Sequence, residues 1–214
     1  MSEKQHKYVI EHMEPEFSDW VKLEYLQIQR DVGKSNFYIS SVPADVKESD
    51  LPKEFIDAGL QWTHTEITNF QSVDPTFPSD SSRICLLDPS ATEELSPEDA
   101  DKFDFFLFGG ILGDHPPRDR TGELRKYGYT SRNLGKKQMT TDTAVRVTKI
   151  ICTEKKKLDE IDYVDYPELK FNKHESTEMP FRYVVEPGTQ KPILPEGMFE
   201  LIKEDSKRSL DDLI

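Results

Sequence analysis

The sequence has few cysteines. Among its 214 residues only Cys85 and Cys152 are cysteines, so a disulfide framework is excluded and a CxxC zinc motif is absent. Each is flanked by aliphatic residues, which is typical of a small buried side chain. His6 and His12, near the start of the chain, have no cysteine or carboxylate partner at a recognised ligand spacing, so we expect no metal site.

Long apolar runs are also missing. No stretch approaches the ~20 apolar residues that span a bilayer, and the first seven residues lack the apolar core of a signal peptide. We therefore expect a protein of the cytosol or nucleus that does not contact membranes, and we assign it to the cytoplasm. The chain is long enough to bury a continuous core, and 10% of its residues are aromatic. A single domain over residues 1–214 is the expected organisation.

Positive charge is scarce overall, but it is not evenly distributed. The chain has a net charge of −13, to which residues 1–112 contribute −13, residues 113–149 contribute +5 and residues 150–214 contribute −5. Because phosphate binding depends on clustered Lys and Arg, the acidic whole argues against stable nucleic-acid binding. The negative net charge favours a cationic partner instead, whereas the basic stretch at residues 113–149 keeps a local RNA contact possible.

Patterns typical of strands and helices alternate along the chain. The expected strands lie at about residues 7–10, 36–40, 63–67, 83–89, 104–108 and 180–185, and the expected helices at 18–33, 49–58, 141–155 and 198–203, with a brief helix opening at 96 and helical turns within 118–126. This alternation predicts an α/β fold with a mainly parallel sheet flanked by helices. We expect the end of the chain, residues 205–214, to be mobile.

Three glycines follow the most hydrophobic of these strands. Gly109, Gly110 and Gly113 come after Phe108, at a position where parallel sheets bind ligands. Glycines allow the backbone to turn sharply and to approach a ligand closely. A tight turn that serves only the fold is the alternative. The continuation over residues 114–120 contains two prolines and several ionisable groups, which a simple turn does not require.

A second loop precedes the helix that starts at Thr141. Either Thr140 or Thr141 can cap that helix, and capping is sufficient to explain the two threonines. It does not explain Leu134, Gly135 and Met139. An adenine ring requires an apolar slot of this kind, bordered by backbone donors and acceptors.

Together with the segment after the preceding strand, these loops resemble the SPOUT class of methyltransferases. The resemblance covers about residues 83–153, and residues 108–121 are similar to a small branch that includes a protein arginine methyltransferase acting on a small-subunit ribosomal protein. It implies a trefoil knot in the carboxy-terminal half and S-adenosylmethionine (SAM) as the cofactor. The cofactor pocket would then be lined by Leu87, Asp88, Pro89, Phe108, Gly109, Gly110, Gly113, Leu134, Gly135, Met139, Thr140 and Thr141.

Methylation of a guanidinium would require a carboxylate that orients the cationic group. Asp114, on the glycine turn, is the first candidate, although an Asx turn explains it equally well. Glu123 is the second candidate. His115 is a candidate proton acceptor, but shaping of the loop is the simpler explanation for it.

The leading functional hypothesis is therefore a protein arginine methyltransferase that acts on a basic ribosomal protein. An RNA methyltransferase and a non-catalytic, ribosome-associated module that binds the cofactor are the alternatives. Many SPOUT relatives are dimers that methylate RNA, but this chain is acidic outside residues 113–149, and we expect a monomer. Residues 154–214 form an acidic extension that either acts as a lid or guide for a basic partner or remains a solvated tail.

Overall fold

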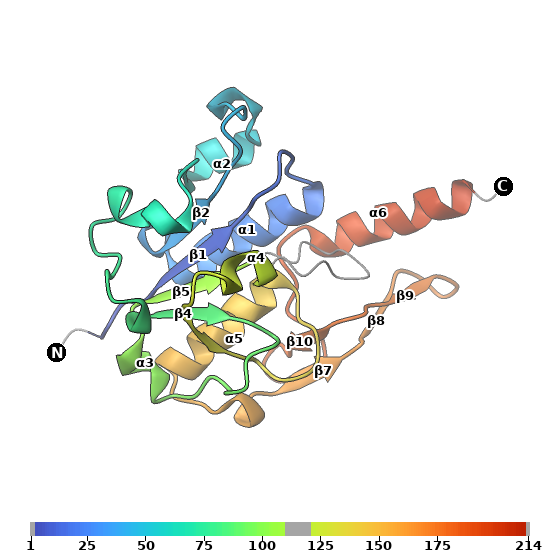
Figure 1. Cartoon of the computed structure of the whole chain (residues 1–214). Helices are drawn as coiled ribbons and strands as arrows, with labels where there is room; N and C mark the ends of the chain where they lie inside the picture. Colours follow the sequence, from blue (N-terminus) through green and yellow to red (C-terminus); the bar gives the residue numbers. More distant parts are fainter. Residues whose placement is uncertain (1–2, 110–120, 213–214) are drawn as a thin grey trace.

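The structure is a computed structural model that describes residues 3–109 and 121–212. Within those residues the central sheet consists of β1 (Lys7–Glu11), β2 (Phe37–Ser40), β3 (Gln61–Trp62), β4 (Ile84–Leu87), β5 (Phe105–Phe108) and β6 (Thr130–Arg132). Its strands are all parallel and are arranged in the order β3-β2-β1-β5-β4-β6 (Figure 1). The predicted parallel α/β fold is confirmed, whereas the trefoil knot stays a prediction.

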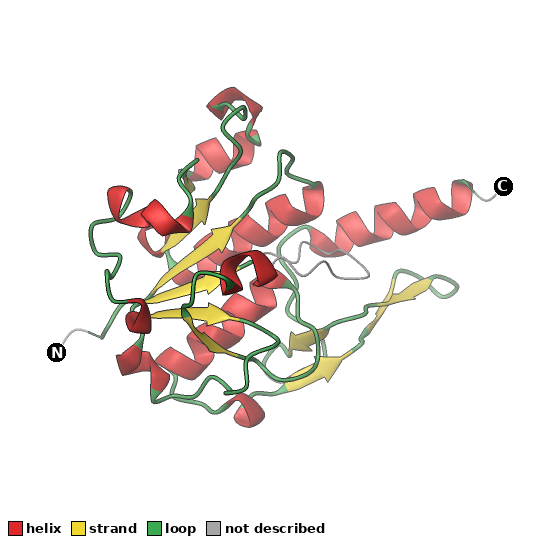
Figure 2. Ribbon diagram, in the orientation of Figure 1, coloured by secondary structure: helices red, strands yellow, loops and turns green. Residues whose placement is uncertain are grey.

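Helices cover both faces of this sheet (Figure 2). On one face lie α1 (Asp19–Val32) and α5 (Thr141–Thr153), and on the other η3 (Ile67–Ser72) and α4 (Thr121–Arg125). Alternate residues of β1 face the two layers: Tyr8 and Ile10 belong to the core beneath α1 and α5, and Val9 belongs to the core beneath η3 and α4. Both faces are apolar, which explains why the strands appear in the sequence as continuous hydrophobic runs. The short elements around them are η1 (Lys34–Asn36), η2 (Glu48–Asp50), α2 (Lys53–Ala58), η4 (Ser81–Arg83), α3 (Asp99–Lys102) and η5 (Leu158–Glu160).

The boundaries of α1 follow from its capping residues. The hydroxyl of Ser18 accepts a hydrogen bond from the Val21 amide at 3.2 Å, and Gly33 ends the helix with a φ of 95°. Two predicted elements differ from the structure. The strand expected at 63–67 lies at 61–62, because Ile67 starts η3 and is buried beneath the sheet. The helix expected at 49–58 is divided into η2 and α2 before Pro52, which has no amide hydrogen to continue it.

The carboxy-terminal region forms two small antiparallel sheets and a helix. β7 (Tyr163–Asp165) pairs with β10 (Arg182–Val184), β8 (Glu168–Lys170) pairs with β9 (Ser176–Glu178), and α6 (Met198–Asp211) follows. The helix expected at 198–203 continues to Asp211, so residues 205–211 are helical, and the mobility of this end stays a prediction. Met198 and Ile202 anchor the start of this helix in a core shared with Trp20 of α1, and Figure 1 shows the rest of the helix projecting away from the sheet.

Cys85 and Cys152 are both buried and unpaired, as predicted. None of the helices in the described ranges has the length and apolar character needed to cross a membrane.

Candidate functional site

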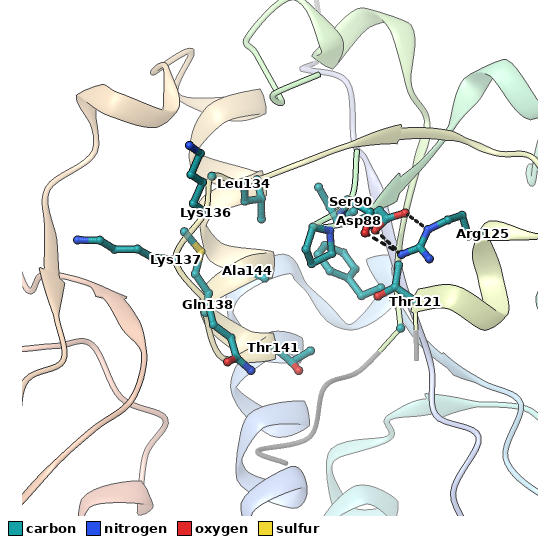
Figure 3. Close-up of a pocket in the computed structure, with 16 residues that line it drawn as sticks. Asp88, Ser90, Thr121, Arg125, Leu134, Lys136, Lys137, Gln138, Thr141 and Ala144 are labelled. Carbon is teal, nitrogen blue, oxygen red and sulfur yellow. Dashed lines mark hydrogen bonds and ion pairs between the residues drawn. The ribbon is translucent and has the colours of Figure 1, made fainter. Parts of the chain in front are cut away.

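A cavity of about 350 Å³ opens at the edge of the sheet where β4, β5 and β6 end (Figure 3). Ligands of parallel sheets bind at this edge, and the volume lies within the range of small-molecule sites. One wall comes from the segment after β4 and from α4, and the opposite wall from the segment that leads into α5. The lining residues are Leu87, Asp88, Pro89, Ser90, Phe108, Gly109, Thr121, Arg125, Leu134, Gly135, Lys136, Lys137, Gln138, Met139, Thr141 and Ala144.

The structure brings together most of the residues that were predicted to line a pocket. Leu87, Asp88, Pro89, Phe108, Gly109, Leu134, Gly135, Met139 and Thr141 all lie on the walls of this cavity. Thr140 is buried next to them but does not line the cavity, and its hydroxyl oxygen lies 2.6 Å from that of Thr143. Gly110 and Gly113 lie outside the described residues.

The three candidate catalytic residues are not on the described walls. Asp114 and His115 lie outside the described residues. Glu123 is on α4, where 66% of its side chain is exposed and its carboxylate lies 3.4 Å from the ammonium group of Lys126. The chemical roles of all three therefore stay predictions.

The first wall is held by an ion pair between Asp88 and Arg125. The guanidinium donates two hydrogen bonds to the carboxylate, at 2.6 and 2.8 Å, and a third to the Ser90 hydroxyl at 3.3 Å (Figure 3). The Asp88 side chain is only 2% exposed, and hydrogen bonding to Arg125 lowers the pKa of its carboxyl group. Two parallel N–H···O bonds fix the relative orientation of both groups, so this pair fastens the segment after β4 to α4.

The second wall, residues 134–141, is fastened at several points. The Arg182 amide donates to the Gln138 carbonyl oxygen at 2.8 Å, and Met139 forms a parallel bridge with Arg182. The Asp165 carboxylate accepts hydrogen bonds from the side chains of both Lys137 and Arg182. The small carboxy-terminal sheet formed by β7 and β10 therefore lies directly behind this wall.

Gly135 gives the second wall its tight turn. Its φ of 88° is in the left-handed region, and a Cβ at this position would lie 3.4 Å from a methyl group of Leu158. A larger residue would therefore strain the backbone, although its Cβ would make only an ordinary contact with Leu158.

A buried carboxyl group from a distant helix caps the start of α5. Thr140 occupies the N-cap position but makes no side-chain cap hydrogen bond. Instead, the Asp142 amide donates to Glu24 of α1 at 3.0 Å, and the Trp20 indole also donates to Glu24. Glu24 and Asp142 are each only 1% exposed, and burial raises the pKa of both carboxyl groups. Thr140 thus occupies the N-cap position as predicted, but its side chain makes no cap hydrogen bond, because its hydroxyl lies against that of Thr143.

Sequence reasoning missed several residues that build this site. Arg125 lies 37 residues from Asp88, and Glu24 lies 118 residues from Asp142, so no local spacing pointed to either partner. A basic residue within the predicted helical turns at 118–126 was the only available sign of Arg125. Gln138 was not missed, because it lies within the loop from Leu134 to Thr141 that the resemblance placed on the pocket.

The chemistry of the walls suits a flat apolar group with polar substituents. Leu87, Phe108, Leu134, Met139 and Ala144 supply apolar surface. Gly109 and Gly135 allow backbone groups to approach a ligand. Asp88 is the sole carboxylate on the described walls, and Arg125 already holds it.

Comparison with known proteins places this geometry in context. The model of the family described as "Protein arginine N-methyltransferase SFM1-like" matches residues 7–209. Protein arginine N-methyltransferase SFM1 of Saccharomyces cerevisiae is 55% identical over 214 residues, covering 97% of this chain and 99% of the yeast protein. The crystal structure of the yeast arginine methyltransferase SFM1 complexed with SAM is 52% identical, with a TM-score of 0.89 over 94% of this chain and 92% of that chain. A structure described as that of a novel protein arginine methyltransferase is 37% identical, with a TM-score of 0.56 over 93% of this chain and 94% of that chain.

Proposed function

This chain belongs to the SFM1-like family of protein arginine N-methyltransferases, and we propose that it uses SAM to methylate an arginine of a basic small-subunit ribosomal protein. The observation that carries this proposal is the cavity at the carboxyl edge of the sheet, where the three segments selected from the sequence meet. The similar yeast structure complexed with SAM supports the choice of cofactor.

In this proposal the apolar walls hold the adenine ring. Leu87, Phe108, Leu134 and Met139 provide the surfaces against which a flat heterocycle packs. Gly109 and Gly135 bring backbone donors and acceptors close to its edge. The ion pair between Asp88 and Arg125 fixes the segment after β4 relative to α4, so the first wall is already formed before the ligand enters.

When bound, the cofactor supplies an electrophilic methyl group: an arginine nitrogen attacks the methyl carbon, the carbon–sulfur bond breaks with its electron pair moving to sulfur, and the nitrogen loses a proton. The protein must hold the guanidinium in line with that bond and orient its charge. Because the Asp88 carboxylate on the described walls is already paired with Arg125, we assign this orienting role to Asp114, which follows Gly113 in the sequence. Glu123, which is exposed and close to Lys126, is the weaker candidate.

Substitution of these two carboxylates separates the candidates. Asp114→Asn is expected to lower kcat by about a hundredfold or more, because the amide cannot balance the charge of the guanidinium. Glu123→Gln is the matched control and is expected to leave kcat within about twofold. Initial rates at saturating substrate measure both effects. The opposite ranking would transfer the orienting role to Glu123.

The distribution of acidic residues supports a basic protein substrate. Glu16, Asp45, Glu48, Asp50 and Glu66 are exposed on loops that follow β1, β2 and β3. These loops lie at the same carboxyl edge as the cavity. Their negative potential attracts a cationic protein and repels a phosphate backbone. We place the activity in the cytoplasm and assign it to a monomer.

Incubation of the purified protein with radiolabelled SAM tests the proposed function. RNA-free small-subunit ribosomal proteins and small-subunit ribosomal RNA are supplied in separate reactions. Label in an arginine of a protein is the expected result. Label in RNA would favour an RNA methyltransferase, and tight binding of SAM without transfer to either would favour a non-catalytic module.

A further inference from the structure

Tyr166, between β7 and β8, is an exposed aromatic residue with an unusual backbone conformation. Its relative exposure of 47% equals the highest value among the large hydrophobic residues described. Its φ is 51°, in the left-handed region that side chains other than glycine rarely adopt. Pro167 follows, and a residue before proline favours an extended conformation. The position is therefore unfavourable for tyrosine on two counts.

The turn itself does not explain the choice of tyrosine. Glycine adopts a positive φ without steric cost and would connect β7 to β8 more easily. The ring is not a core side chain either, because it lies on the surface. Strained residues persist where the surrounding structure enforces them, and they cluster at functional sites. The side chain of Tyr166 is therefore the feature that requires an explanation.

Tyr166 lies next to the second wall of the cavity. Lys137 lines the cavity, and its ammonium nitrogen lies 5.9 Å from the centre of the Tyr166 ring. The Tyr166 amide donates a hydrogen bond to the Phe181 carbonyl oxygen at 3.0 Å, which fixes the backbone of the turn. Figure 3 shows the Lys137 side chain extending away from the cavity. A peptide leaving the cavity on this side would reach Tyr166.

The strands that follow Tyr166 carry two facing carboxylates. Glu168 of β8 is directly opposite Glu178 of β9, and both side chains are exposed. Like charges at facing positions of an antiparallel pair destabilise it. A cation placed between them would remove that repulsion, and the face of an aromatic ring also attracts cations.

We propose that Tyr166, Glu168 and Glu178 form a docking surface for a cationic segment of the substrate protein that flanks the methylated arginine. Lysine or arginine side chains of that segment lie on the Tyr166 ring and between the two carboxylates. The negative charge of Glu168 and Glu178 selects this occupant, and the contact of Tyr166 with Lys137 places the surface next to the cavity. The inference rests on the proposed function, since it assigns a binding surface to the same substrate.

Removal of the ring tests the docking surface against a purely structural role. Tyr166→Gly and Tyr166→Ala both remove the ring, but only glycine relieves the backbone. Both variants are expected to raise the KM for RNA-free small-subunit ribosomal proteins about threefold, without changing kcat or the affinity for SAM measured by calorimetry. Tyr166→Gly is also expected to raise the melting temperature by about 1–3 °C, whereas Tyr166→Ala is not. A stability gain together with weaker substrate binding is the signature of a functional side chain.

Two control variants complete the experiment. Tyr166→Phe keeps the ring, so its KM is expected to equal that of the wild type. Lys155→Gly relieves a comparable positive φ of 58° beyond the far end of α5, so it is expected to add stability with no change in KM. An unchanged KM in both ring-deleted variants, with an active wild-type enzyme, would overturn the docking surface alone. Absence of methyl transfer by the wild type itself would overturn the proposed function, and the docking surface with it.

Discussion

The two walls of the cavity are held in place by different kinds of interaction. The first wall, after β4, is joined to α4 by the ion pair between Asp88 and Arg125. The second wall, residues 134–141, is held by a backbone hydrogen bond to β10, by the ion pairs of Asp165 and by the Glu24 cap on α5. Hydrogen bonds with Arg132 and Asn133 also hold the segment after β4, but within the described residues its hydrogen bonds to α4 come from one side chain, Arg125, whereas several side chains fasten the second wall. Single substitutions should therefore damage the first wall most.

Arg125→Ala is the substitution with the largest expected effect. It leaves the buried Asp88 carboxylate without its guanidinium partner, and an uncompensated buried charge is costly. Because Arg125 is itself 41% exposed, we expect a loss of about 2–3 kcal/mol in the free energy of unfolding. Urea denaturation measures this loss. The affinity for SAM should also fall, by about tenfold, because the wall is no longer fixed.

The neighbouring residue supplies the matched control for that experiment. Lys126 pairs with Glu123 at the surface, where both side chains are more than half exposed. Lys126→Ala should change the free energy of unfolding by less than about 0.5 kcal/mol. Equal losses for Arg125→Ala and Lys126→Ala would show that the buried ion pair does not hold the first wall.

The difference between the walls also explains what the sequence could predict. β4 and β5 are apolar on both faces, so they appear as hydrophobic runs, and the loops that follow them could be selected as ligand sites. β6 is polar (Thr-Ser-Arg) and gives no such pattern. It is a strand because it pairs with β4, with Cys85 facing Thr130.

The fastenings of the second wall could not be predicted. β10 lies within the strand predicted at residues 180–185, but β7 contains only three residues, which is too short for a pattern of alternation, so the pairing of the two strands was not predicted. The contact of Asp165 with Lys137 joins positions 28 residues apart, and Glu24 reaches Asp142 across 118 residues. Acidic residues in the carboxy-terminal segment suggested a solvated tail, but Asp165 pairs with the wall of the cavity. Charge composition alone does not distinguish these two situations.

The pH dependence of stability provides a test of the Glu24 cap. Burial, together with the charge of Asp142, raises the pKa of Glu24 well above its usual value near 4.5. Burial also raises the pKa of Asp142, although the charge of Arg146 opposes this shift. Folding therefore favours the protonated forms. The contribution of Glu24 to stability is complete below about pH 4.5 and that of Asp142 below about pH 3.8, and each is lost as the pH rises through the folded-state pKa.

Glu24→Gln removes the titrating group but keeps its shape. Between pH 5 and pH 7 the free energy of unfolding of this variant should fall less than that of the wild type. The two slopes should differ by at most about 1.4 kcal/mol per pH unit. Urea denaturation at both pH values measures the difference. Glu200→Gln, on the exposed face of α6, is the control and should follow the wild-type curve. Parallel curves for all three proteins would exclude proton uptake by Glu24 on folding.

Asp165→Ala should have the smallest effect, because the second wall keeps its other contacts. Hydrogen bonding to Arg182 lowers the pKa of Asp165 to about 2, so the carboxylate is charged at neutral pH and pairs with Arg182 and Lys137. The pair is partly exposed, and its loss should cost about 1 kcal/mol. The affinity for SAM should fall by less than about threefold, since the backbone bond from Arg182 to Gln138 remains. Asp162→Ala, which changes an exposed residue of the same acidic segment, should leave both quantities unchanged. A loss of affinity for Asp165→Ala as large as that of Arg125→Ala would mean that a single ion pair also controls the second wall, and the distinction between the walls would then be wrong.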